Sequence, residues 1–508
     1  MLPTTVGQII RPAATLMPAA VALIDGDVEL SYVELDERCN RVAHGLRRLG
    51  VERGDRVAVL FPNEYRFVES LLGAMRAGAI VVPCNPRLDD VSLRYVLGHS
   101  ETRVLLVSAD LAEQASRVAD GLPMLEAVVS GDDWCVGASG DPIDVPVGSD
   151  DPAMLPYTSG STGRPKGALL THRGLMWCYD AQRKAMLIDH TERSLVPVPL
   201  CHVNGMAGGL MPLLLAGGSV VVLRDFEPRA LLASLERHRC TFMTGVPALY
   251  QRLLEERAAL AECDLSALRF VNCGSATAPP ELLRAIRAAF GVRVTEGYGL
   301  TEGGPVCAKT PRWGPERPGS VGLPFPGAKL RLVSTEDGAR ELGDDQIGEL
   351  WVRTPGNAVG YYREPELTAE RFTPDGWLKT GDLARRDQDG YYYFVGRRDD
   401  MINCGGDKVY PKYVEDVLLR HPDVAAACVV AAPHPTKGAA PVAFVVRRGS
   451  AALDELTLRA YFLRHGSAYA HPRRITFLLE LPLTSIGKVD RLALTRRAAD
   501  AATVVAPA

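Results

Sequence analysis

Short apolar runs alternate with segments of helical spacing in the first half of the chain, and this alternation constrains the fold more than any other feature. A helix is predicted at 64–77, and strands are predicted around it at 56–61, 79–82 and 102–107. The alternation returns in residues 219–256. Because strand–helix–strand repeats pack as a parallel sheet with helices on its faces, we expect an α/β fold.

Two later stretches have a different character. Residues 320–395 are rich in β-branched and aromatic residues and in Gly and Pro turns, which predicts antiparallel strands or a small β-barrel. Beyond them, helices are predicted at 411–420 and 456–465, with strands at 424–432 and 441–446. We therefore expect a large N-terminal domain of stacked mixed αβ subdomains plus the barrel (1–396) and a small, mobile α+β C-terminal domain (397–508) with a frayed tail at 498–508.

Composition narrows the class of protein further. Lys and Arg number 57 and Asp and Glu number 61, so the net charge of −4 gives no electrostatic reason to expect a nucleic-acid partner. The uncharged stretch 203–223 is long enough to cross a bilayer, but Pro212 and the pair Gly217-Gly218 interrupt it. We predict a buried helix, a glycine stop and a strand there, and no membrane span.

Cysteine and histidine usage indicates the compartment and the kind of site. The eleven cysteines form no Cys-x-x-Cys pair, which is typical of reduced thiols in a cytoplasmic protein. The ten histidines show no metal-ligand spacing, so no structural zinc is expected.

The strongest local signal is the loop at 157–167, YTSGSTGRPKG. Its three glycines let backbone N–H groups approach an anion, its four Ser and Thr hydroxyls add donors, and Lys166 adds a positive charge. The common P-loop pattern does not fit, because Pro165 and Gly167 stand where that pattern needs Gly and Ser or Thr. A solvated Ser/Gly loop is the alternative, but the eleven positions together favour a phosphate site.

This loop resembles the signature loop of the adenylate-forming superfamily: acyl- and aryl-CoA synthetases, nonribosomal-peptide adenylation domains and beetle luciferases. The resemblance runs through nearly the whole chain, from Asn63 to Lys488. It implies that a carboxylic acid attacks ATP, that pyrophosphate leaves, and that the acyl group then passes from AMP to a thiol. The implied cofactors are ATP, Mg²⁺ and, as co-substrate, CoA.

Further motifs resemble the family's nucleotide site. Tyr298 would stack on adenine, Thr301 would bond phosphate, and Asp382 would accept from the ribose hydroxyls. Glu302 would hold Mg²⁺, because a hard divalent ion prefers carboxylate and phosphate oxygens. The resemblance implies these ATP- and AMP-binding residues: Thr158, Ser159, Gly160, Ser161, Thr162, Gly163, Gly274, Ser275, Ala276, Tyr298, Gly299, Thr301, Asp382 and Arg397.

The resemblance also implies a catalytic set of Lys488, His202 and Lys166. The Lys488 ammonium would bridge the attacking carboxylate and the α-phosphate. Asp399 matches the hinge about which the C-terminal domain would swing between the two half-reactions. The thiol side would then include Gly405, Gly406, Lys437 and Arg473, although ordinary surface charge explains the two basic residues equally well.

The PLCHVNG segment around His202 resembles the CoA-ligase branch in particular. Amino-acid-activating relatives carry an Asp here, and no Asp occurs between Val196 and Leu223. The acid pocket implied by family position consists of His202, Asn204, Met206, Val246, Tyr250, Cys273 and Ala276. These side chains suggest an apolar acid, either aryl or aliphatic of modest length.

Alternatives to a CoA ligase stay open. His434, Ala439 and Ala470 depart from the family pattern where the thiol would bind, so the acceptor could be a carrier-protein phosphopantetheine. A luciferase-like oxygenase is disfavoured by the His202 segment. A non-catalytic nucleotide-binding protein on the same fold is disfavoured because a pure binder has no need of Lys488. A homodimer is also left open.

Overall fold

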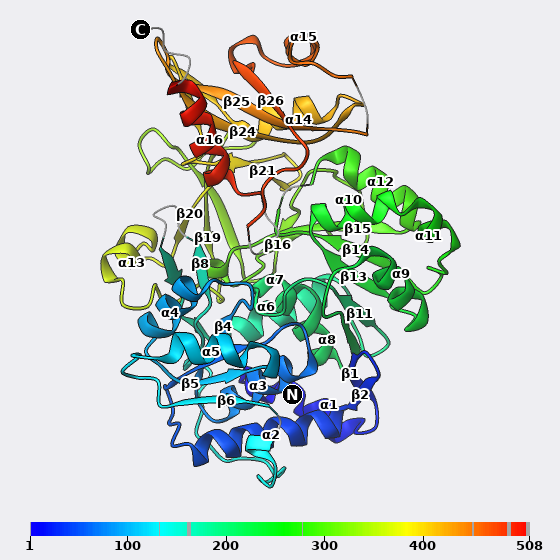
Figure 1. The fold of residues 1–508 in the computed structure, drawn as a ribbon, viewed down its shortest axis with the longest axis vertical. Helices are drawn as coiled ribbons and strands as arrows, with labels where there is room; N and C mark the ends of the chain where they lie inside the picture. Colours follow the sequence, from blue (N-terminus) through cyan, green and yellow to red (C-terminus); the bar gives the residue numbers. More distant parts are fainter. Residues whose placement is uncertain are drawn as a thin grey trace.

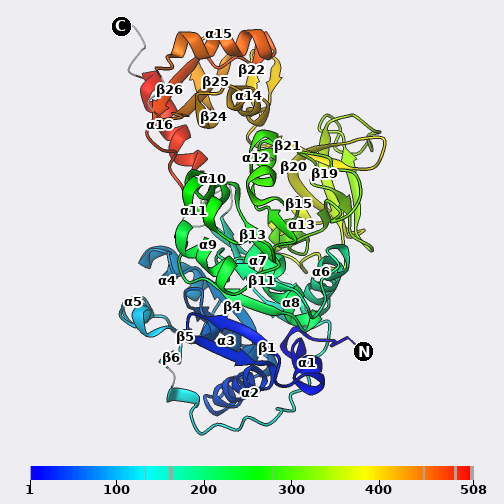
Figure 2. The same ribbon diagram turned by 90° about the vertical axis from the view of Figure 1, so that its right-hand side faces the viewer.

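The computed structural model describes residues 2–131, 133–159, 164–276, 278–449, 452–484 and 489–503. Within them the chain forms stacked layers of sheet and helix. The C-terminal sheet and its helices lie at the top of both views, above the two large N-terminal sheets (Figures 1 and 2).

The first large sheet is six-stranded and mainly parallel, as the alternating pattern predicts. Its order is β10-β7-β4-β3-β5-β6, and only the β7–β10 pair is antiparallel among the described strands. Successive residues of a strand face opposite sides, so Val57 and Val59 pack in one core and Ala58 and Leu60 in the other. The strands are β3 (Arg56–Leu60), β4 (Ile80–Cys84), β5 (Thr102–Val107), β6 (Ala127–Ser130), β7 (Pro152–Met154) and β10 (Leu170–Thr171).

Helices cover both faces of this sheet. On one face lie α2 (Tyr32–Arg48) and α3 (Tyr65–Arg76), and on the other lie α4 (Asp90–His99) and α5 (Ala112–Ala119). Helix α2 begins with a capping box, because the Ser31 side chain accepts from the Glu34 backbone N–H while the Glu34 carboxylate accepts from the Ser31 backbone N–H.

The second large sheet has nine strands in the order β17-β16-β15-β14-β13-β11-β12-β1-β2. Its central strands are parallel, and antiparallel pairs close each edge. The strands are β1 (Val21–Asp25), β2 (Val28–Ser31), β11 (Arg193–Val196), β12 (Ser219–Val222), β13 (Phe242–Gly245), β14 (Phe270–Cys273), β15 (Arg293–Tyr298), β16 (Ala308–Lys309) and β17 (Leu323–Pro324).

Two different cores flank this sheet. One contains α9 (Pro228–Arg237), α10 (Pro247–Glu255), α11 (Arg257–Glu262) and α12 (Pro280–Phe290), on the right in Figure 1. The other contains α1 (Arg11–Leu16), α6 (His172–Ala185), α7 (Val203–Gly205) and α8 (Met211–Ala216), and it is continuous with the α2–α3 layer of the first sheet.

The uncharged stretch 203–223 folds as predicted. It runs through α7, a π-helical turn at Met206–Leu210 and α8, and then reaches β12. Gly217 ends α8 with φ +81°, a left-handed conformation that glycine adopts without strain. No helix in the described part of the chain has the length and apolar character to cross a bilayer.

The third sheet is antiparallel, with the order β18-β19-β20-β21. It confirms the antiparallel strands expected in residues 320–395. However, its edge strands β18 and β21 share no ladder in the described residues, so this unit is an open sheet and not a closed barrel. The strands are β18 (Lys329–Val333), β19 (Gly348–Arg353), β20 (Leu378–Arg386) and β21 (Tyr392–Arg397), with α13 (Pro365–Arg371) between β19 and β20.

The C-terminal sheet follows at Ile402, with the order β23-β22-β25-β24 and β26 beside β25. The expected frayed tail is wrong for residues 498–503, because α16 continues to Thr503 and buries Ala498 against β24 and β25. The elements are β22 (Ile402–Cys404), β23 (Asp407–Val409), α14 (Pro411–Leu419), β24 (Val424–His434), β25 (Gly438–Arg447), α15 (Glu455–His465), β26 (Arg474–Leu478) and α16 (Arg491–Thr503).

Candidate functional site

The phosphate loop is carried by a two-stranded hairpin. Strands β8 (Tyr157–Ser159) and β9 (Pro165–Gly167) pair with Thr158 opposite Lys166. The tip of the hairpin, Gly160, Ser161, Thr162 and Gly163, lies outside the described residues, as does the side chain of Ser159. The hairpin arms nevertheless fix where the tip begins and ends, and Lys166 is half-buried on one of them.

Glu302 lies against this hairpin, although 144 positions separate it from Thr158. Thr158 Oγ1 donates to Glu302 Oε1 at 3.3 Å, and the Tyr361 hydroxyl donates to the same oxygen at 2.9 Å. Glu302 belongs to a 3₁₀ turn, Thr301–Gly303, which begins shortly after β15 ends at Tyr298. The two motifs are therefore brought together by the fold.

This arrangement fits the implied Mg²⁺. A single carboxylate beside a hairpin expected to bind phosphate is the donor set that Mg²⁺ uses when it shares its coordination with substrate phosphates and water. In the described part of the chain, no cluster of three or more His, Cys, Asp or Glu side chains offers a complete protein cage. Glu302 is therefore the residue that would hold the ion.

Asp382 lies in a second buried polar group. Its Oδ2 accepts a 2.6 Å hydrogen bond from the Tyr298 hydroxyl, and its Oδ1 lies 3.4 Å from Arg397 Nε. Burial raises the pKa of Asp382, while the Arg397 charge and the Tyr298 hydrogen bond oppose that rise. The Tyr298 ring is itself 7 % exposed and packs in the core with Cys307 and Leu330. Stacking of this ring on adenine stays a prediction.

Two positions after the ends of β14 and β15, Ser275 and Gly299, have backbone constraints that limit which residues fit there. A Cβ added to Gly299 would stand 1.9 Å from Pro305 O, so only glycine fits there. Ser275 has φ +64°, an uncommon left-handed conformation for a residue other than glycine. It follows Gly274 at the β14 end, and Ala276 beside it is exposed. Strained backbone of this kind clusters at ligand sites.

His202 lies at the start of α7, next to the nine-stranded sheet. It is the N-cap of α7, and its Nδ1 accepts from the Asn204 backbone N–H at 3.2 Å. Asn63, from the first sheet, fixes the segment before it: its amide donates to Val198 O at 2.9 Å and accepts from Leu200 N at 2.8 Å. The sequence resemblance began at Asn63, and this contact gives that residue a positioning role.

The expected acid pocket is divided by the sheet. His202, Asn204 and Met206 lie on the α7 side, and the half-buried Val246 packs against the cores of both faces. The side chains of Cys273 and Tyr250 lie in the core of the opposite face, where the Tyr250 hydroxyl donates to Asn272 O at 2.8 Å.

A buried polar set on the α7 side was missed by sequence reasoning. It consists of Thr244, Asn272, Thr295 and Lys309, all at most 8 % exposed. The signal available was a lysine inside the run PVCAKTP, in a strand too short for its pattern to show which face it occupies. Because an isolated lysine is normally a surface residue, the pattern alone does not distinguish it.

The residues expected on the thiol side form part of one surface. Gly405 (φ +67°) and Gly406 (φ +99°) make the turn between β22 and β23. The Gly405 N–H donates to Lys437 O at 3.1 Å, so Lys437 adjoins this turn, while Arg473 lies at the start of β26 with its N–H bonded to Pro441 O. Asp399 is exposed just after β21. Lys488 lies outside the described residues.

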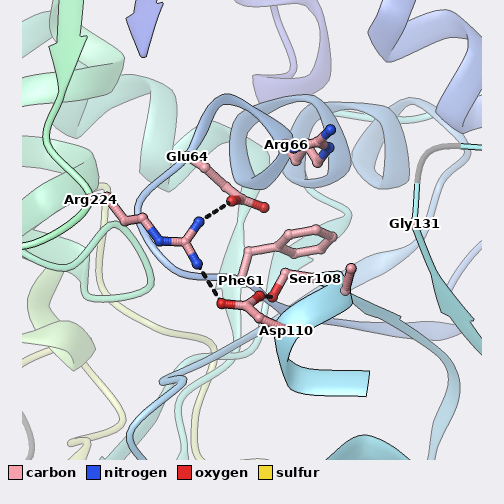
Figure 3. Close-up of a pocket in the computed structure, with 8 residues that line it drawn as sticks. Phe61, Glu64, Arg66, Ser108, Asp110, Gly131 and Arg224 are labelled. Atoms are coloured by element: carbon pink, nitrogen blue, oxygen red, sulfur yellow. Dashed lines mark hydrogen bonds and ion pairs between the residues drawn. The ribbon is translucent and has the colours of Figure 1, made fainter. Parts of the chain in front are cut away.

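A cavity of about 320 Å³ lies elsewhere, between the two large sheets (Figure 3). Arg224, after β12, bridges Glu64 at 2.9 Å and Asp110, so residues from both sheets are joined by one guanidinium. None of the site residues expected from the sequence lines it. Arg224 thus pairs with both carboxylates of the lining, which is consistent with a structural link between the sheets.

Two family models match the chain. Residues 10–362 match the model of the AMP-binding enzyme family, and residues 413–488 match that of the AMP-binding enzyme C-terminal domain. The chain is 37 % identical to a feruloyl-CoA synthase of an Amycolatopsis species, over 95 % of this chain and 97 % of the relative. It is 36 % identical to a sulfoacetate–CoA ligase of Cupriavidus necator, over 97 % of this chain and 98 % of the relative.

A solved structure similar to this chain is also that of a CoA ligase. The anthranilate CoA ligase AuaEII, solved with anthranoyl-AMP, superposes with a TM-score of 0.92 at 29 % identity, covering 99 % of both chains. The family matches cover most of the chain and the relatives span nearly its whole length. The chain therefore belongs to the AMP-binding enzyme family, as an AMP-forming acyl-CoA synthetase that uses ATP, Mg²⁺ and CoA.

Proposed function

We propose that both half-reactions of the ligase occur where the hairpin, Glu302 and Asp382 converge, with residues 397–508 acting as a domain that swings about Asp399. The contact between Thr158 and Glu302 is the observation that carries this proposal. It joins the phosphate loop to a carboxylate suited to Mg²⁺, and neither motif alone accounts for nucleotide chemistry.

In the first half-reaction a carboxylate oxygen attacks the α-phosphorus of ATP and the bond to pyrophosphate breaks. Such a transfer needs positioning and charge neutralisation more than a covalent protein group. Lys166 on the hairpin arm and Lys488 from the C-terminal domain would supply positive charge, and Mg²⁺, when bound at Glu302, neutralises phosphate charge. Asp382 and Arg397 would hold the nucleotide, and His202 would border the carboxylate.

In the second half-reaction the thiol of CoA attacks the acyl carbon and AMP leaves. The hinge would carry Lys488 away and bring the Gly405-Gly406 turn toward the acyl-adenylate. Lys437, which adjoins that turn, supports a thiol surface there, with Arg473 available for CoA phosphates. Transfer to a carrier-protein phosphopantetheine is the second candidate for this step.

The acid is proposed to have an apolar body, aryl or aliphatic of modest length, along Met206 and Val246. The two relatives named above have nearly equal identity to this chain, and one is named for an aryl acid and the other for a sulfonated one. Sequence identity therefore does not indicate which class of acid this chain uses. The side chains of the acid site have to indicate it instead.

A panel of carboxylates tests the proposal. Hydroxylamine trapping detects any acyl-adenylate, and AMP release with and without CoA separates the two half-reactions. We expect Lys488→Ala to abolish carboxylate-dependent pyrophosphate exchange, and the exposed Lys184→Ala to leave it intact. AMP release that needs a carrier protein instead of CoA would select the second candidate, and exchange at wild-type rate in Lys488→Ala would refute the role of that lysine.

We further propose that the enzyme works in the cytoplasm. All eleven cysteines are free thiols, as expected in a reducing compartment. A homodimer is tested directly by sedimentation equilibrium of the purified chain.

A further inference from the structure

The buried polar set on the α7 face of the nine-stranded sheet forms one hydrogen-bonded row. Thr244, Asn272 and Thr295 are neighbours in register on β13, β14 and β15. Asn272 Nδ2 donates to Thr244 Oγ1 at 3.0 Å, and Thr295 Oγ1 lies 3.3 Å from Asn272 Oδ1. Residues in register share a face, so this row points toward α7 and the π-helical turn.

Lys309 reaches this row from the edge of the sheet. It pairs in register with Gly297 on β15, and its Nζ donates to Asn272 Oδ1 on the next strand at 2.7 Å. The aliphatic stem passes over Gly297, since a Cβ built there would lie 3.6 Å from Lys309 Cγ. The ammonium is thereby placed over β14, away from solvent.

The row has more hydrogen-bond donors than acceptors. A lysine ammonium carries three protons, and Asn272 Oδ1 is its one acceptor in the described residues. No carboxylate lies within ion-pair distance of Lys309 in that part of the chain, and burial lowers the pKa of its amine to about 7. Asn204 Nδ2, on α7, is also buried with no acceptor among the described residues. Unsatisfied buried donors of this kind are costly unless a ligand supplies oxygen atoms.

The row lies beneath residues assigned to the acid. Building a Cβ on Gly274 places it 3.7 Å from Asn272 Nδ2, and one on Gly208 would lie 3.0 Å from Asn204 Oδ1 and 3.1 Å from Thr244 Oγ1. Gly208 therefore lies close to both Asn204 and Thr244, and it has no side chain of its own to separate them. Asn272 precedes Gly274 and Ser275 on the chain, so the row lies farther back along the strands than the nucleotide segment at the β14 end.

We propose that Lys309 determines acid specificity, by receiving an anionic oxygen group at the far end of the carboxylic acid, with Asn204 Nδ2 as a second donor. The inference rests on the proposed acid site and deepens it. The acid class is one with an apolar body and a second carboxylate or a sulfonate at its distal end. No bond is made or broken at Lys309, which acts as a specificity residue.

Matched pairs of acids test the inference. Hexanoate is compared with adipate, and benzoate with terephthalate and 4-sulfobenzoate, by kcat/KM for CoA-dependent AMP release. We expect the wild type to favour the distal anion of at least one pair by about tenfold or more. We expect Lys309→Met to lower this anionic-to-neutral ratio by about 10- to 100-fold, because a charge-assisted hydrogen bond is lost. The same substitution at the exposed Lys329→Met should leave the ratio unchanged.

A second variant keeps the test decisive if Lys309→Met fails to fold. Asn272→Asp has the same shape and gives Lys309 an internal carboxylate, so it should also abolish the preference. A structural role alone would change the unfolding midpoint without changing the ratio. If neutral acids are used and no distal anion is preferred in any pair, the inference is overturned while the ligase assignment stands. If no acid yields AMP, both are overturned.

Discussion

Tyr298 and Asp382, 84 positions apart, are joined by a 2.6 Å hydrogen bond from the tyrosine hydroxyl to Asp382 Oδ2. The tyrosine is the last residue of β15 in the nine-stranded sheet, and the aspartate lies on β20 of the antiparallel sheet. One oxygen of the carboxylate is thus held by Tyr298 while Arg397 lies 3.4 Å from the other. The two sheets therefore present a fixed carboxylate at their junction.

Replacing Asp382 by Asn should weaken ATP binding. The substitution keeps the shape but removes the charge that pairs with Arg397 and that would accept from ribose hydroxyls. We expect the KM for ATP to rise about 10- to 100-fold, with a smaller rise of about twofold to fivefold for Tyr298→Phe, which leaves the charge in place. Steady-state kinetics at saturating acid measure both. An unchanged KM for ATP in Asp382→Asn would contradict the assignment.

Replacing Glu302 by Gln should raise the Mg²⁺ requirement. The amide keeps a hydrogen-bond acceptor for Thr158 and Tyr361 but loses the anionic oxygen that a hard cation prefers. We expect the Mg²⁺ concentration for half-maximal rate to rise about tenfold or more. The exposed Glu281→Gln serves as the control. Equal Mg²⁺ titrations for Glu302→Gln and wild type would exclude a metal role for this residue.

Replacing Asn63 by Ala should impair the acid side of the site and leave the nucleotide side intact. Asn63 donates to Val198 O and Leu223 O and accepts from Leu200 N, so three backbone groups lose a partner. We expect unfolding to become easier by about 2–4 kcal/mol, and the KM for the acid to rise while the KM for ATP changes little. Urea unfolding and steady-state kinetics check the two parts separately.

Local sequence pattern predicts many of the strands and helices, but it does not predict which face of a sheet each side chain occupies. The strands and the helix predicted from periodicity in residues 56–107 are present with small boundary shifts, but α4 (Asp90–His99) was not predicted. Cys273 and Tyr250 were expected in the acid pocket, yet their side chains pack in the opposite core. Adjacent strand residues point to opposite faces, so assigning a segment to a site does not tell which of its side chains faces the ligand.

Contacts between distant segments could not be read from local pattern. The hydrogen bond from Thr158 to Glu302 depends on how a hairpin between β7 and β10 of the first large sheet meets a turn between β15 and β16 of the second. The partner of Lys309 depends on the register between β15 and β16, which only two residue pairs define. Motif resemblance assigned Thr158 and Glu302 to the same nucleotide site but did not state their contact, and it contained nothing about Lys309.

The last prediction concerns Glu296, on β15 next to Gly297. Burial raises the pKa of its carboxyl to about 8, against the opposing effects of the Gly319 N–H, which lies 3.3 Å from Oε2, and of the Lys412 charge. An unfolded glutamate titrates near 4.5. Between these values the folded state keeps a proton that the unfolded state releases, so the contribution of Glu296 to stability is complete below about pH 4.5 and is lost as the pH rises through about 8.

Glu296→Gln is neutral at every pH and removes this dependence. We expect the variant to gain stability over the wild type as the pH rises from about 5 to about 8.5, by about 1–3 kcal/mol in the free energy of unfolding. Urea unfolding at both pH values measures the change. The exposed Glu262→Gln should show no such trend, since its carboxyl stays in water in both states. A difference between Glu296→Gln and wild type that is the same at both pH values would mean that Glu296 is ionised in the folded protein.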